Sequence, residues 1–175
     1  MDDKGQFMME PLYRRSPNQF FSIKDKISEW DFSELHGIGF RSSHEKYACL
    51  ELKVHAQEKY LLKENRELTF SGSHVHWNVD PNNFPLDLYE YGRKELLTHA
   101  AFVSDLFSVL KGEKVSLIFE IIFAGYHPVD LWGKGAVGHA FNAAILSCFN
   151  PQLLQQGLIR KQSDHRFNSG KYTPH

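Results

Sequence analysis

The residues with the clearest chemical potential lie in SGSHVHWNVDPNNFP, residues 71–85, where His74 and His76 stand two positions apart. Side chains alternate between the two faces of a β-strand, so both imidazoles would point to one side, with Cα atoms roughly 6.5–7 Å apart. Such a pair can converge on a metal ion, but zinc needs three or four ligands. The candidates for the missing ligands are Asp80, His99, His127, Asp130 and His139, and no spacing selects among them.

The same segment is also explained without any metal. Val75, Trp77 and Val79 would occupy one face of the strand, while Asn78 and Asp80 would continue the polar series of the histidines. That alternation is typical of a half-buried strand. The polar face would then meet solvent or a protein partner, and we expect no bound metal and no cofactor.

A second candidate is the segment GYHPVDLWGKGAVGH, residues 125–139. Its GKGAVG run matches GxGxxG, but a dinucleotide fingerprint needs the first glycine directly after a strand and an acidic residue about twenty positions later. Neither condition holds, since no Asp or Glu occurs between Asp130 and Asp164. The loop does contain residue types that form ligand pockets or interface anchors, although a loop tryptophan can equally fill a core. They are Tyr126, His127, Asp130 and Trp132.

Covalent catalysis finds little support in the sequence. No GxSxG occurs, and no CxxC is present to hold zinc. Cys49 and Cys148 lie in apolar segments, which predicts two buried free thiols. Glu51 and Glu120 could act as a carboxylate pair only if their strands adjoin.

Composition limits the classes of partner. The chain has 175 residues, 42% hydrophobic, and a formal net charge of −1, which fits one globular domain with no general attraction to nucleic acid. The basic and aromatic residues between 160 and 172 could contact single-stranded nucleic acid, but acidic residues elsewhere offset their charge. The longest apolar run, LIFEIIFAG, is too short to span a membrane, and the N-terminus has no apolar signal region. We therefore expect a cytoplasmic protein without membrane or nucleic-acid partners.

The elements that must position these residues follow from hydrophobic periodicity. Phe20, Ile23, Ile27 and Trp30 have the spacing of a short amphipathic helix, and residues 36–39 are interpreted as an irregular turn. The remaining expected elements are strands at 47–55, 67–80 and 115–124 and helices at 86–110 and 136–148.

This order predicts an α+β domain, a small antiparallel sheet with helices packed mainly on one face. The domain would span residues 20–160, between a flexible arm at 1–19 and a disordered tail at 161–175. The strand at 115–124 should be central, because it is apolar on both faces. The expected shared core contains Trp77, Val103, Phe107, Leu117 and Phe119.

One stretch resembles a known group of proteins. The order NRELTF, GSHVHWNVD, a helix and LKGEKVSLIFE, within residues 65–120, is similar to a strand–HxH–helix–strand arrangement in small bacterial immunity proteins of polymorphic toxin systems. The resemblance implies a compact domain that binds and blocks a cognate toxin without chemistry of its own. The leading hypothesis is therefore a non-enzymatic binding protein with a toxin domain as its protein partner. The alternative is a metal-dependent hydrolase or nuclease that uses His74 and His76.

Overall fold

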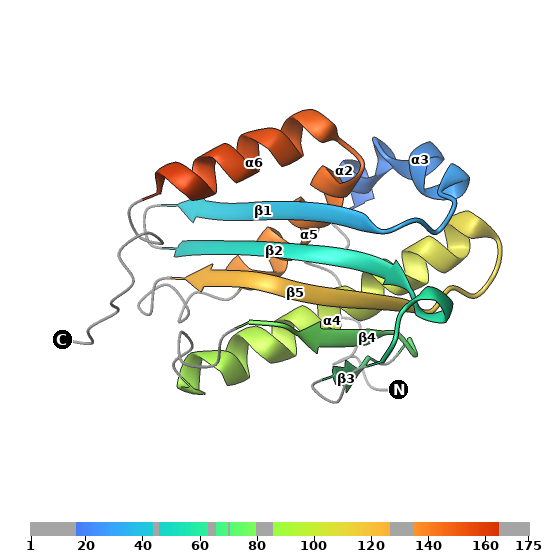
Figure 1. Ribbon diagram of the computed structural model, residues 1–175, viewed down its shortest axis with the longest axis horizontal. Helices are drawn as coiled ribbons and strands as arrows, with labels where there is room; N and C mark the ends of the chain where they lie inside the picture. The colour runs from blue at the N-terminus through green and yellow to red at the C-terminus, as the bar shows by residue number, and fades with distance from the viewer. Residues whose placement is uncertain are drawn as a thin grey trace, which may run out of the picture.

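A single five-stranded sheet organises the protein (Figure 1). The computed structural model describes residues 17–43, 46–62, 66–69, 71–79, 86–126 and 135–164. The strand order is β1-β2-β5-β4-β3, and every neighbouring pair is antiparallel except β4 and β5. The strands are β1 (Leu35–Ser43), β2 (Lys46–Ala56), β3 (Arg66–Leu68), β4 (His74–Trp77) and β5 (Leu117–Tyr126).

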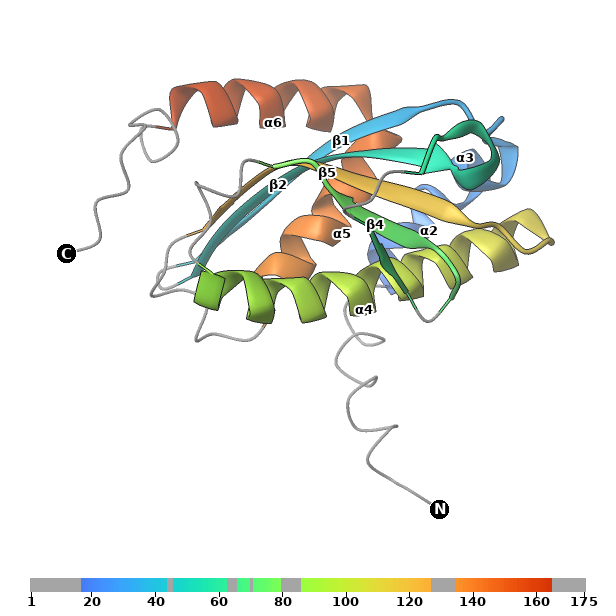
Figure 2. The ribbon, with the colours of Figure 1, turned by 60° about the horizontal axis from the view of Figure 1, so that its bottom comes forward.

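The helices divide unequally between the two faces of the sheet (Figure 2). One face, here called the core face, packs against α2 (Pro17–Phe21), α3 (Lys24–Glu29), α4 (Leu86–Lys111) and α5 (Ala136–Cys148). The opposite face, here called the polar face, carries α6 (Pro151–Ser163) over β1 and β2. A short 3₁₀ turn, η1 (Gln57–Lys59), follows β2. The predicted α+β class, with helices mainly on one face, is confirmed.

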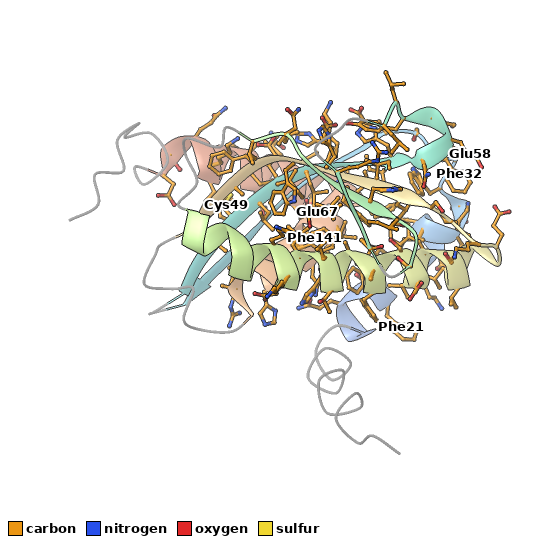
Figure 3. All side chains as sticks on the ribbon, turned by 90° about the horizontal axis from the view of Figure 1, so that it is seen from below. Phe21, Phe32, Cys49, Glu58, Glu67 and Phe141 are labelled. Carbon is orange, nitrogen blue, oxygen red and sulfur yellow. The ribbon has the colours of Figure 1, made fainter. Side chains whose placement is uncertain are left out.

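The core lies between the sheet and the helices of the core face. The expected residues Trp77, Val103, Phe107, Leu117 and Phe119 all belong to this one cluster, so their shared core is confirmed. Figure 3 shows Phe141 of α5 inside this layer, whereas Cys49 lies on the side of the sheet nearer α6. β5 is the middle strand, as its apolar character on both faces predicts.

Local signals place the long elements correctly. The predicted helix at 86–110 is α4, and Gly112, with φ 71°, follows its end. The helix at 136–148 is α5 with the same limits. Four apolar residues with helical spacing, Phe20, Ile23, Ile27 and Trp30, are all buried. None of the helices in the described ranges has the length and apolar character that crossing a bilayer requires.

The turn expected at residues 36–39 is wrong, because these residues belong to strand β1. Gly37 and Gly39 face α5 at backbone contact distance, where an added Cβ on Gly39 would lie 2.0 Å from the carbonyl oxygen of Ala140. The glycines therefore serve close strand–helix packing and do not form a turn. The outer edge of β1 is also closed here, since the backbone N–H of Ile38 donates to Ser147 Oγ at 2.8 Å.

The single strand expected at 67–80 is also wrong. The chain forms β3 and β4 as a hairpin, closed by a hydrogen bond from Thr69 N to Ser73 O at 2.7 Å, with Gly72 at φ 83°. Although the strand is interrupted, Val75 and Trp77 still face the core. β4 is parallel to β5 because α4 carries the chain across the sheet between them.

The C-terminal part differs from expectation as well. The apolar stretch after Asn150 forms helix α6, and the Asn150 side chain accepts hydrogen bonds from the backbone of Gln152 and Leu153. The helix continues to Ser163, beyond the predicted domain limit at 160. The rest of the expected tail, residues 165–175, and most of the expected arm, residues 1–16, lie outside the described residues.

Candidate functional site: the polar face of the sheet

A row of polar side chains crosses the polar face of all five strands. The strand register places Arg66 of β3 beside His76 of β4, and His76 beside Glu120 of β5. It continues from Glu120 to Lys53 of β2 and from Lys53 to His36 of β1. Residues paired in this way share one face of a sheet. Tertiary pairing thus assembles positions that are distant in sequence into one continuous surface.

Glu120 is the carboxylate of this row, and it is buried, with 8% of its surface exposed. Its Oε2 lies 2.9 Å from Nε2 of His55, and its Oε1 accepts a hydrogen bond from Asn78 Nδ2 at 3.0 Å. A buried carboxylate is costly unless its oxygens find donors. The side chains from β2 and from the residue after β4 supply them, so Glu120 joins three segments of the sheet.

Tyr60 closes over this group from the segment that follows β2. Its hydroxyl lies 2.8 Å from Nδ1 of His76, and its ring centroid lies 4.4 Å from that of His55. Burial, and then the nearby charge of Glu120, raise the pKa of the Tyr60 hydroxyl, which therefore remains protonated and can donate. His76 itself is buried. Tyr60 thus links the loop to β4.

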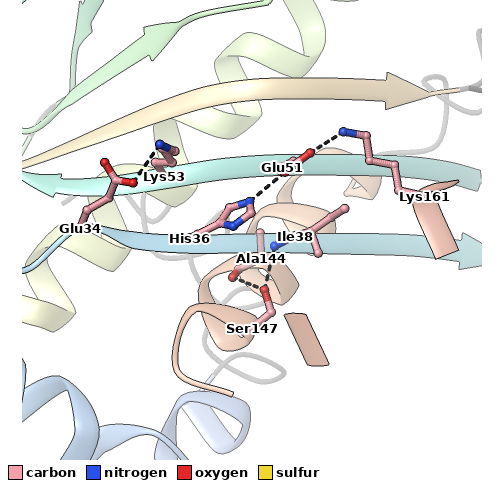
Figure 4. A network of polar contacts seen from close by, with 8 residues as sticks. All are labelled: Glu34, His36, Ile38, Glu51, Lys53, Ala144, Ser147 and Lys161. Carbon is pink, nitrogen blue, oxygen red and sulfur yellow. Dashed lines mark hydrogen bonds and ion pairs between the residues drawn. The ribbon is translucent and has the colours of Figure 1, made fainter. Parts of the chain in front are cut away.

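A second carboxylate, Glu51, connects β2 to its neighbours (Figure 4). Its Oε1 lies 2.8 Å from Nε2 of His36 on β1, and its Oε2 forms an ion pair with Lys161 of α6. The residue is buried, so two donors compensate its desolvation. Glu51 therefore provides a polar connection between α6 and the sheet.

Glu34, just before β1, links this part of the face to the Glu120 group. Its carboxylate lies 2.8 Å from Lys53 Nζ and 3.5 Å from Nδ1 of His55 (Figure 4 shows the pair with Lys53). His55 thus has a carboxylate at each ring nitrogen, Glu34 on one side and Glu120 on the other. The His55 ring therefore lies between the carboxylates of Glu34 and Glu120 and connects the two parts of the polar face.

The two predicted histidines have different environments. His76 is hydrogen-bonded to Tyr60, whereas His74 is half-buried, and its enclosed Nδ1 has no hydrogen-bond partner among the described residues. Burial, and then the charge of Arg66, lower the pKa of His74, so its imidazole is neutral at pH 7. Asn78 is exposed at the surface.

The other predicted binding residues could be placed only in part. Tyr126 is the last residue of β5. Asp80, His127, Asp130 and Trp132 lie outside the described residues.

Possible metal ligands do not gather around these histidines within the described ranges. No group of at least three His, Cys, Asp or Glu side chains there is arranged to hold a metal ion. His99, one of the suggested ligands, lies instead between α4 and α5, with its Nδ1 3.1 Å from Asn142 Oδ1. Burial lowers the pKa of His99, and an added Cβ on Gly138 would lie 2.2 Å from its ring. His99 thus packs against the first turn of α5.

Sequence reasoning identified β4 but missed the partners that surround it. His55 and Tyr60 were not among the predicted site residues, although the alternation in YACLELKVH places Glu51, Lys53 and His55 on one strand face. The condition that Glu51 and Glu120 lie on adjoining strands is met, since β2 pairs with β5. The alternation within each strand indicates which residues share a face. The pairing of the strands decides which of these residues become neighbours.

The thiols play no part in this network. Cys49 and Cys148 are free cysteines, and Cys49 is buried while Cys148 is half-buried. Burial raises the pKa of Cys49 to about 12 and also raises the pKa of Cys148. Neither thiol is ionised near neutral pH, so neither is an activated nucleophile.

Two leucines stand out on the surface beside the network. Leu61 directly follows Tyr60 and is 85% exposed, and Leu68 of β3 is 66% exposed. Leu68 pairs with His74, so it lies on the polar face. Leu61 thus adjoins Tyr60 along the chain, and Leu68 adjoins His74 in the sheet.

Comparisons with models of protein families and with curated proteins find no match to this chain.

Proposed function

We propose that this chain is a non-enzymatic binding protein of the immunity kind, which contacts a toxin domain through the polar face around Tyr60 and β3. The observation that carries the proposal is the exposure of Leu61 and Leu68 beside a hydrogen-bonded polar layer. Interfaces commonly combine apolar anchors with surrounding polar groups, and a rigid surface loses little entropy on binding.

The chemistry of the buried groups supports binding over catalysis. Both buried carboxylates already have partners. Glu120 contacts His55 and Asn78. Glu51 contacts one imidazole from β1 and one lysine from α6. A general base needs access to the proton that it removes. Carboxylates held in this way make the polar face rigid. The exposed groups around Tyr60 and β3 would then contact the partner.

The partner should present an apolar patch that covers the two leucines, with acidic groups toward the adjacent basic side chains. Lys59 and Arg66, both exposed, each precede one of the leucines by two positions in sequence. Charge complementarity of this type increases association rates and selects partners. His74 is the neighbour of Leu68 in the sheet, so a partner that reaches His74 would contact a neutral imidazole.

The test uses the toxin domain encoded by a neighbouring gene and titration calorimetry. Leu61→Ser and Leu68→Ser together should weaken binding at least tenfold, about 1.4 kcal/mol. The matched control is Val109→Ser, because Val109 is also an exposed aliphatic residue, at 76%, but lies on α4 behind the core face. Unchanged affinity in the double variant, or an equal loss in the control, would remove this face from the interface.

A further inference from the structure

Helix α6 is attached to the polar face through a small apolar cluster of its own. Ile38 and Cys49 form this cluster, with Leu154 and Leu158 of α6 packed against them. It is separate from the main core between the sheet and the other helices. Loss of the α6 contacts would therefore leave the main core intact, because the two clusters lie on opposite faces of the sheet.

The contact is close but narrow. Gly157 is the one fully buried residue among the thirteen of α6, and an added Cβ there would lie 2.4 Å from Cγ2 of Ile38. Both leucines that complete the contact, Leu154 and Leu158, are only half-buried. Since apolar stabilisation scales with the area removed from water, this interface is weak relative to the main core.

Polar contacts hold the last turns of α6. Lys161 forms the ion pair with Glu51, and its Nζ also lies 4.2 Å from the centre of the Phe123 ring. The guanidinium of Arg160 lies 4.4 Å from the centre of the Phe40 ring. Cation–aromatic contacts at accessible sites are individually weak. The attachment thus depends on a few separable interactions.

The rest of the molecule does not need α6 to keep its geometry. The backbone of Ile38 is held at the edge of β1 by Ser147 of α5, and Phe149 and Asn150 lie between the two helices. Ser147 Oγ in turn donates to the carbonyl of Ala144 (Figure 4). β1 therefore remains fixed by α5 when its contact with α6 is broken.

We propose that α6 is a hinged cover that opens from the sheet, about the Asn150–Pro151 junction, while the remaining domain stays folded. Opening would uncover Ile38, Cys49 and Phe123, which adds an apolar strip to the polar face, and would separate Lys161 from the Glu51 carboxylate while His36 remains bound to it. The free protein would thus exchange between a covered and an uncovered form of one sheet face. This inference concerns a property of the free chain and does not depend on the proposed partner.

Cys49 provides a built-in reporter of this opening. It lies beneath α6, and its thiol reacts only when it becomes accessible and can ionise. The sulfur of Cys148 lies between α5 and β1, where an added Cβ on Gly37 would be 2.6 Å from it, so this thiol reports on larger unfolding even though the residue is half-buried. The wild-type protein is treated with a thiol reagent over a series of low urea concentrations, and mass spectrometry follows each cysteine separately.

The expected result is that Cys49 reacts at least ten times faster than Cys148, with little dependence on urea below the unfolding transition. Local opening exposes little surface and therefore responds weakly to denaturant. Hydrogen exchange should agree, with amides of α6 exchanging before those of α5. Equal labelling rates with the same urea dependence, or equal protection of both helices, would overturn the proposal.

Two variants test the attachment itself. Gly157→Ala places a Cβ against Ile38, and Lys161→Met removes the ion pair with Glu51; each should accelerate Cys49 labelling at least fivefold without changing the labelling of Cys148. The matched control is Lys53→Met, which breaks the ion pair with Glu34 on the same face but away from α6. No acceleration in either variant, or the same acceleration in the control, would show that α6 does not open separately.

Discussion

Removing the carboxylate of Glu120 should destabilise the protein far more than removing that of Glu34, although both belong to the same network. Glu120 is 8% exposed and is bound by His55 and Asn78, whereas the Glu34 side chain is 50% exposed and pairs with Lys53. Breaking a buried charge pair costs about 3–5 kcal/mol, because the remaining partner keeps its desolvation cost. An exposed pair contributes about 0–1 kcal/mol.

The structure allows these ranges to be narrowed. Asn78 is exposed and can bind water once its partner is lost, and Tyr60 keeps its contact with His76, so the loss in Glu120→Ala falls mainly on His55. We therefore expect a loss near the lower end, about 3 kcal/mol in the free energy of unfolding. Glu120→Gln preserves the volume and one acceptor for Asn78, and should cost about 1 kcal/mol, the difference between a charged and a neutral hydrogen bond.

Urea denaturation measures all three variants under the same conditions. The expected order of destabilisation is Glu120→Ala, then Glu120→Gln, then Glu34→Ala, with unchanged dependence on urea concentration. If Glu120→Ala cost no more than Glu34→Ala, the carboxylate of Glu120 would have to be hydrated in solution. The polar layer would then not be the rigid base on which the proposed binding surface depends.

Three further predictions concern packing, pH and metal. Gly39→Ala should lower the free energy of unfolding by about 1–3 kcal/mol or more, because the new Cβ would meet the backbone oxygen of Ala140; an unchanged thermal midpoint would contradict the close strand–helix contact. Burial holds the pKa of His99 below its value in the unfolded chain. The unfolded state therefore binds a proton first as pH falls through about 6.5, and the stability of the folded protein declines. The decline in stability from about pH 7.5 to 5.5 should be smaller in His99→Gln, and an equal decline in both proteins would show that His99 is not its cause. Purified protein should contain no stoichiometric zinc, and elemental analysis that finds about one zinc per chain, lost when His74 and His76 are both alanine, would favour the enzyme hypothesis.

The burial of His76 changes what a histidine variant would report. Alanine at His76 would leave the Tyr60 hydroxyl without its imidazole partner, so folding and binding would be affected together. His74 is half-buried and has no such partner at Nδ1, so substitution there should affect folding less. The exposed leucines are therefore the cleaner probes of the proposed interface.

The sequence by itself determined the elements whose pattern is local and long. The alternation in β2 and the apolar stripe of α4 define their buried faces, because periods of two and 3.6 residues follow from backbone geometry alone. The same reasoning correctly assigned Val75 and Trp77 to the core and the two neighbouring histidines to the opposite face. The assignment of these residues to the two faces is correct even though the strand was predicted too long.

Only the tertiary structure decided what meets each face. Gly37 and Gly39 resemble turn residues in sequence, but they belong to a strand. Because they have no side chains, α5 can approach the strand backbone closely. His55 and Glu120 are 65 positions apart in sequence, and their contact depends on the pairing of β2 with β5, which no local pattern encodes. Likewise, α6 packs on the polar face because Gly157 fits against Ile38. Strand order and helix placement arise from the fit of distant surfaces, so the charged partners of each side chain follow from packing and not from spacing along the chain.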